Sequence, residues 1–64
     1  MDSEQTISYE VEAFYTDGHS SIVDQGDGAI GEARARARAA YSDSDVMSVR
    51  VLVDGGEVWG NTRS

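Results

Sequence analysis

Hydrophobic and polar residues alternate along two stretches of the chain. The first covers residues 6–16, where one side of the alternation carries Ile7, Tyr9, Val11, Ala13 and Tyr15, and the other carries Ser8, Glu10, Glu12 and Phe14. The second covers residues 46–53, with Met47, Val49, Val51 and Val53 on one side and Ser48, Arg50 and Leu52 on the other. Because successive side chains of a strand point to opposite faces, each stretch predicts a strand whose first-named side faces the core.

A helical spacing replaces this alternation over residues 27–41. Apolar residues recur there three and four positions apart and form one stripe: Ile30, Ala33, Ala37, Ala40 and Tyr41. At 3.6 residues per turn, the spacing predicts the only helix of the chain. The stripe is mostly alanine, so we expect the helix to lie close to the sheet that it covers. Asp27 is the expected N-cap, because a carboxylate at that position accepts hydrogen bonds from free backbone N–H groups.

Asp17-Gly18 follows the first strand and predicts a hairpin. Asp-Gly is typical of a two-residue type I′ turn, in which both residues have positive φ. Such a turn pairs Ala13 with Ile22, places Ile22 under the helix, and gives a short second strand over residues 19–24.

Residues 54–56, Asp-Gly-Gly, predict a second hairpin with two possible registers. A two-residue Gly-Gly turn pairs Val53 with Val58 and places Trp59 on the outer face of the sheet. A three-residue loop with a bulge pairs Val51 with Trp59 and buries the indole. The buried indole is favoured, because an exposed tryptophan on so small a domain needs a reason.

Together these elements predict an α+β fold in the order β-β-α-β-β. The simplest arrangement is a four-stranded antiparallel sheet with strand order 2-1-3-4 and the helix packed on one face. The 64 residues form one domain, with an ordered core over about residues 5–60 and a frayed tail over residues 61–64.

Charge is the most unusual property of the composition. The chain has twelve acidic residues, five arginines and no lysine, and its formal net charge is −7. Residues 1–32 carry no base and eight of the acids: Asp2, Glu4, Glu10, Glu12, Asp17, Asp24, Asp27 and Glu32. Such a chain repels nucleic acids and anionic membranes and is attracted to basic surfaces. The absence of cysteine excludes disulfides and thiolate metal sites.

Two motifs suggest a ligand, but their context favours a structural role. Residues 26–31 match GxGxxG, yet a dinucleotide-binding fold needs parallel strands and a longer chain, so we expect a tight turn and no cofactor. Asp24, Asp27 and Glu32, or residues 43–45, offer oxygen atoms to calcium. Neither set matches a calcium-binding loop, so we expect capping and no metal.

The remaining candidate residues do not indicate catalysis or nucleic-acid binding. His19 is the only histidine, the chain has no cysteine and no serine has the sequence context of a nucleophile, so we expect no enzymatic activity. Arg34, Arg36 and Arg38 are too few against twelve acids to form a nucleic-acid-binding patch. We expect them to pair with Glu32 and with carboxylates at the sheet edge.

The outer face of the sheet is the strongest candidate site. Carboxylates are mixed there with apolar groups, and no second helix is available to cover them, as is typical of a protein-binding surface. The residues predicted to bind a partner, on this face and around the adjoining turns, are Glu10, Glu12, Phe14, Asp17, Asp24 and Asp27.

In size, acidity and single-helix pattern, the chain resembles small phage-encoded inhibitors, anti-CRISPR proteins among them. The resemblance implies a nucleic-acid mimic, whose carboxylates take the place of phosphates on a basic protein surface such as that of a CRISPR effector complex. The expected protein is a monomer or weak homodimer in the cytoplasm, or in the host cytoplasm if a phage encodes it. The alternative is a solubility-tuned accessory domain or homodimer, from a high-salt or GC-rich organism or its phage, with no nucleic-acid-related target.

Overall fold

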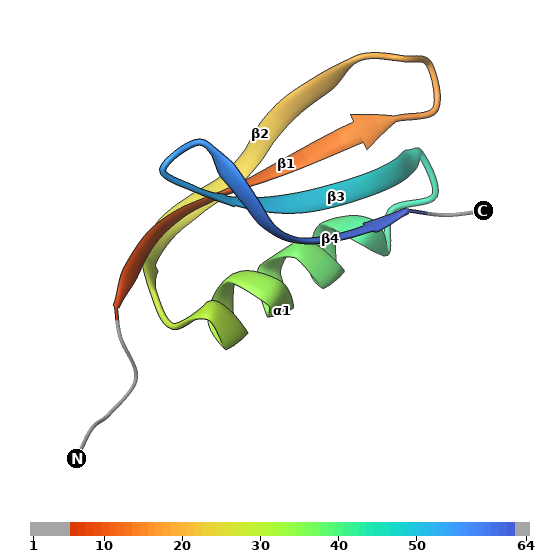
Figure 1. Ribbon diagram of the computed structural model, residues 1–64. Coiled ribbons are helices and arrows are strands. Elements are labelled where there is room, and N and C mark those ends of the chain that lie inside the picture. Colours follow the sequence, from red (N-terminus) through yellow and green to blue (C-terminus); the bar gives the residue numbers. More distant parts are fainter. Residues whose placement is uncertain (1–5, 63–64) are drawn as a thin grey trace.

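The computed structural model describes residues 6–62 of the chain. Its elements follow one another as β1 (Ile7–Tyr15), β2 (Ser20–Gly28), α1 (Ile30–Tyr41), β3 (Val46–Val53) and β4 (Gly56–Thr62). The four strands form one antiparallel sheet in the order β2-β1-β3-β4, and α1 covers one face of it, as Figure 1 shows. The predicted α+β architecture is therefore confirmed.

The core lies between α1 and the two central strands, β1 and β3. Ala33 and Ala37 of α1 have no exposed surface, which confirms that alanines form the contact with the sheet. The sheet contributes the other buried side chains: Tyr9, Val11, Ala13, Val46, Val49 and Val51. Ile30 was expected in the buried stripe, but it is 42% exposed. The helix begins only at Ile30, so this side chain lies at the helix end, before the buried alanines.

The first hairpin differs from the prediction. Its loop has three residues, because the N–H of Tyr15 donates to the carbonyl of His19. Within the loop, the N–H of Gly18 donates to the carbonyl of Tyr15. Gly18 has a φ of +99° and takes the left-handed position that such loops require. Ala13 consequently pairs with Ser21 rather than Ile22, and Ile22 lies on the outer face with 45% of its surface exposed.

The second hairpin contains the type I′ turn that was expected in the first. Asp54 and Gly55 have φ values of +54° and +81°, and Val53 pairs with Gly56. A bulge further along β4 then pairs Val51 with Trp59. The favoured pairing is therefore confirmed, although a two-residue Asp-Gly turn produces it. The indole, expected to be buried, packs against the core but is only partly buried.

Three bulges interrupt the sheet, and each places one extra apolar residue on the surface. The extra residues are Val23 in β2, Met47 in β3 and Val58 in β4. They are 41%, 41% and 52% exposed. Met47 was expected to face the core, but the bulge moves it out and Val46, which is 2% exposed, takes the inward position.

The helix start and the chain end also differ from expectation. Residues 26–28 belong to β2, so Asp27 lies in a strand and the N-cap is Ala29, which has no side-chain cap. The carbonyl of Ala29 accepts hydrogen bonds from the N–H groups of Glu32 and Ala33. β4 continues to Thr62, beyond the expected end of the ordered core, while residues 5, 63 and 64 of the predicted core and tail lie outside the described residues.

Candidate protein-binding surface

The six residues predicted to bind a partner lie in three places. Alternation along the strands puts four of them on the outer face of the sheet: Glu10, Glu12 and Phe14 of β1, and Asp27 of β2. Asp17 lies in the turn between β1 and β2, and Asp24 lies on the face that α1 covers. The six residues therefore do not form one surface, because they lie on both faces and at one end of the sheet.

An arginine offsets the charge at the centre of the outer face. Arg50 of β3 pairs with Glu12 of β1 across the ladder, and its Nε donates to Glu12 Oε1 at 2.7 Å. Its guanidinium lies 5.1 Å from the centre of the Phe14 ring, and Nη1 lies 3.8 Å from Glu57 Oε1. Glu12 and Phe14 thus contact a base of their own chain.

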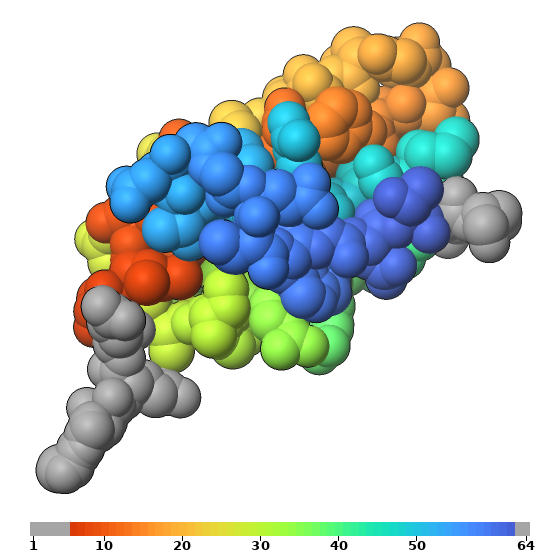
Figure 2. Space-filling model, viewed as in Figure 1, coloured from red at the N-terminus to blue at the C-terminus, as the bar shows by residue number. Residues whose placement is uncertain are grey.

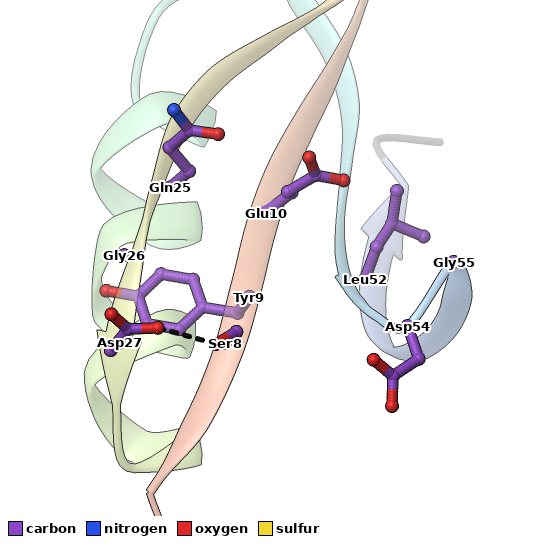
Figure 3. Close-up of a pocket in the computed structure, with 9 residues that line it drawn as sticks. All are labelled: Ser8, Tyr9, Glu10, Gln25, Gly26, Asp27, Leu52, Asp54 and Gly55. Carbon is purple, nitrogen blue, oxygen red and sulfur yellow. Dashed lines mark hydrogen bonds between the residues drawn. The ribbon is translucent and has the colours of Figure 1, made fainter.

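One end of the outer face forms a depression that we call the acidic depression. It has a volume of about 510 Å³ and is lined by Ser8, Tyr9, Glu10, Gln25, Gly26, Asp27, Leu52, Asp54 and Gly55. Figure 3 shows Glu10 on β1 between Gln25 of β2 and Leu52 of β3, in agreement with the strand register. Its charged side chains are three carboxylates, from Glu10, Asp27 and Asp54.

These three carboxylates have few partners. Ser8 Oγ donates to Asp27 Oδ1 at 2.6 Å, the bond drawn in Figure 3. Within residues 6–62, Glu10 and Asp54 make no ion pair and no side-chain hydrogen bond. Negative charge at this depression is therefore not offset by a neighbouring base.

Asp54 is a site residue that the sequence prediction missed. Its Asp-Gly sequence indicated only a turn. The pairing of β1 with β3, which puts Glu10 opposite Leu52, brings that turn beside the end of β1. The predicted strand order 2-1-3-4 already placed β3 beside β1. The register is also needed to show that the turn after β3 lies beside Glu10.

On the opposite face, Asp24 takes part in a polar cluster beneath the helix. Its Oδ1 accepts hydrogen bonds from Arg36 Nη1 at 3.0 Å and from the N–H of Gln25 at 2.8 Å. The Tyr9 hydroxyl donates to Glu32 Oε2 at 3.1 Å, and Arg36 Nη2 lies 3.7 Å from the same oxygen. This cluster confirms the expected pairing for Arg36 with Glu32 and an edge carboxylate.

The cluster shifts two pKa values in directions that follow from its contacts. The pKa of Tyr9 is raised above its ordinary value, first by burial and then by the hydrogen bond to Glu32. The pKa of Arg36 is also raised, first by its hydrogen bond to Asp24. A raised pKa means that the fold favours the protonated form of each group. These forms are the neutral phenol of Tyr9 and the charged guanidinium of Arg36, which the observed hydrogen bonds require.

Asp17 has local partners at the far end of the molecule. Its Oδ1 lies 2.6 Å from His19 Nδ1 and accepts the N–H of His19 at 3.2 Å. His19 also packs against the Tyr15 ring, with 4.8 Å between the ring centres. Asp17 shares a depression of about 370 Å³ with two further acids, Asp43 and Asp45.

The glycine motif and the carboxylates proposed for calcium have structural explanations. Gly26 lies opposite Tyr9, and a Cβ there would lie 3.2 Å from the Tyr9 hydroxyl oxygen. Asp24 and Asp27 are three residues apart in one strand, so their side chains leave opposite faces. Asp43 accepts the N–H of Asp45. Among residues 6–62, no group of three or more His, Cys, Asp or Glu side chains is placed to hold a metal ion.

Comparison with protein-family models, curated proteins and solved structures found no match to this chain. In the described part of the chain, the single helix is too short and too polar to cross a membrane. The class of protein is thus given by the structure alone: a small α+β protein whose sheet has a helix on one face and an acidic depression on the other.

Proposed function

We propose that the chain is an inhibitor that binds a basic protein surface through the acidic depression and thereby keeps nucleic acid from that surface. One observation carries the proposal: Glu10, Asp27 and Asp54 line one depression, and none of them forms an ion pair with a base among residues 6–62. Exposed carboxylates on a fixed sheet match a groove that otherwise receives phosphates.

Other acids of the predicted set contribute less to this proposal. Glu12 and Asp24 each pair with an arginine, and Asp17 contacts His19. The arginines partly neutralise the charges of Glu12 and Asp24 before a partner approaches. Leu52 lines the depression beside the carboxylates and supplies apolar contact, as the core of a protein interface requires. Phe14 lies further along β1, against Arg50.

The nature of the partner follows from the resemblance to small phage-encoded inhibitors. A CRISPR effector complex is the candidate, because it holds nucleic acid in a positively charged channel. The proposed site of action is the cytoplasm of the host cell. Long-range attraction between the acidic chain and such a channel speeds association at low salt and weakens as salt screens the charges.

The proposal is tested by removing the three charges without changing side-chain shape. The test variant combines Glu10→Gln, Asp27→Asn and Asp54→Asn, since asparagine also tolerates the positive φ at position 54. The control combines Asp17→Asn, Asp43→Asn and Asp45→Asn, which removes the same charge from the other acidic depression. Each tagged protein is used to capture partners from a lysate of the source organism at low and high salt, and the captured partner is then challenged with DNA and with RNA.

We expect the test variant to bind the captured partner about tenfold or more weakly than the control does. Added nucleic acid should release the partner from the unmodified chain. Equal losses from both variants would indicate attraction by net charge alone, and would return Asp17 to the binding surface. If neither variant loses binding, or nucleic acid releases nothing, the inhibitor proposal fails and the solubility-tuned accessory domain or homodimer takes its place.

A further inference from the structure

Two arginines of α1 lie against the indole of Trp59 without an acidic partner. The Cζ atoms of Arg34 and Arg38 are 5.6 and 5.8 Å from the centre of the Trp59 ring. Within residues 6–62, neither guanidinium forms a salt bridge, whereas Arg36 and Arg50 each form two. In a chain with twelve acids, two adjacent cations thus lie apart from the carboxylates of the described residues.

The arrangement has two unfavourable features that a bound anion would relieve. Arg34 and Arg38 are four residues apart on one side of the helix, where like charges repel. Arg34 Nε is buried and has no hydrogen-bond acceptor among the described residues, and an unpaired buried donor costs free energy. A carboxylate held between the two guanidinium groups would offset both charges, and it would accept from Nε where the Arg34 side chain turns to present its Nε–Nη edge.

The site adjoins the free edge of the sheet. β4 is an edge strand, and it ends the sheet on the side to which Arg34 and Arg38 extend. Figure 2 shows β4 in dark blue directly against the green helix, with no other element across the visible face of the strand. The outward N–H and C=O groups of an edge strand can pair with a further extended chain.

We propose that Arg34, Trp59 and Arg38 form a binding site for a carboxylate of an acidic peptide segment that lies along β4. The planar guanidinium matches a carboxylate in a bidentate arrangement, and the edge strand supplies the backbone contacts that a free inorganic anion would not use.

A second copy of this chain fits the same edge poorly. Pairing β4 with its symmetry mate by a two-fold axis would bring two Arg34–Arg38 pairs to the same edge, where the four cations would repel one another. Charge complementarity therefore selects an acidic partner rather than self-association. This surface is separate from the acidic depression, and it does not depend on the proposed inhibitor function.

Trp59 is the only tryptophan of the chain, so its fluorescence reports on this site directly. The experiment titrates the full chain with a short glutamate-rich peptide and, separately, with inorganic phosphate at equal ionic strength. We expect a saturable change in fluorescence with the peptide alone. Arg34→Met and Arg38→Met, which keep an apolar side chain over the indole, should each weaken peptide binding by about tenfold.

Arg36→Met is the matched control, because it removes the same charge from the other side of the helix. It should bind the peptide as the unmodified chain does. Arg34→Lys keeps the charge but loses the planar fork, and it should weaken binding nearly as much as Arg34→Met. Circular dichroism of each variant verifies the fold independently of binding.

Four results would overturn the proposal, three from the titrations and one from sedimentation. The first is no saturable fluorescence change with the peptide, and the second is an equal loss of binding in Arg36→Met. The third is phosphate binding as tight as peptide binding, which would make the site a general anion site. Sedimentation at increasing protein concentration should show no self-association that depends on Arg34, whereas a dimer lost in Arg34→Met would assign the edge to a second copy.

Discussion

The two sides of α1 carry the same kind of residue in opposite circumstances. On the side of β2, Arg36 contacts Asp24 and Glu32, and Glu32 in turn accepts the Tyr9 hydroxyl. On the side of β4, Arg34 and Arg38 lie against the indole of Trp59 and form no salt bridge within residues 6–62. On the first side the charges are paired with each other, whereas on the second side two positive charges lie next to an aromatic ring.

Helix geometry produces this difference from a simple repeat. Arginine alternates with alanine over residues 34–38, and successive arginines are therefore rotated by about 200° around the axis. The middle arginine points to one side of the helix and the outer two to the other. A count of charges would treat the three as equivalent, although only their position decides which of them is neutralised.

The largest expected effect tests how tightly the β2 side is packed. In Gly26→Val the new side chain would meet the hydroxyl and ring of Tyr9, a side chain that is 3% exposed. We expect a loss of about 1–3 kcal/mol in the free energy of unfolding, measured by urea denaturation.

Gly56→Val is the matched control at the β4 edge. A Cβ there is 3.6 Å from the carbonyl oxygen of Val53, which is an ordinary contact. We expect a change within about 0.5 kcal/mol. Equal losses at the two positions would mean that the β2 side is no more closely packed than the β4 edge.

A smaller effect separates the arginines themselves. Arg36→Met removes the base from beside Asp24 and Glu32 and should lower the melting temperature by a few degrees at low salt. Arg34→Met loses a contact with the indole but also relieves repulsion from Arg38, so its melting temperature should barely change. In about 1 M salt, where the screening length is about 3 Å, the difference between the variants should shrink. A difference independent of salt would attribute the result to packing.

The smallest expected effect concerns the ionisation of Tyr9. Its folded-state pKa is raised above the ordinary value of about 10, by burial and by Glu32, with Asp24 adding to the shift and Arg36 opposing it. The fold therefore favours the neutral phenol. That stabilisation is complete below about pH 10 and is lost as pH rises through the folded-state pKa.

Urea denaturation from about pH 8 to about pH 11 measures this loss. Tyr9→Phe removes the ionisable group, so the variant should be less sensitive to alkaline pH than the unmodified chain. Both proteins keep Tyr15 and Tyr41, whose contributions cancel in the comparison. The same pH dependence in both would show that Tyr9 does not contribute to it.

Much of the fold follows from local patterns. The alternation over β1 and β3 and the alanine stripe of α1 are strong signals, and they predicted the element order, strand order and central core. Turn geometry was less predictable, because Asp-Gly suits more than one loop. At Asp17-Gly18 it lies in a three-residue loop, whereas at Asp54-Gly55 it forms the two-residue turn.

Residues of the candidate surface could be predicted only where the alternation along a single strand is enough to place them. Glu10 was correctly placed on the outer face by the period of β1. Asp27 was interpreted as a helix cap, because the sequence does not show that β2 continues past Asp24 to pair with the start of β1. Asp54 depends on contacts between segments far apart in the sequence, and no local pattern encodes these.

The bulges at Val23, Met47 and Val58 have a consequence for how this chain can change over time. In an uninterrupted strand, the gain or loss of one residue turns every later side chain to the wrong face. At a bulge, one extra residue is left unpaired, and the alternation of side chains resumes beyond it. Each of the three pairings between neighbouring strands contains one such bulge. Deletion of the extra residue at any of these three positions would therefore leave the later side chains on their present faces, whereas a deletion elsewhere in a strand would not.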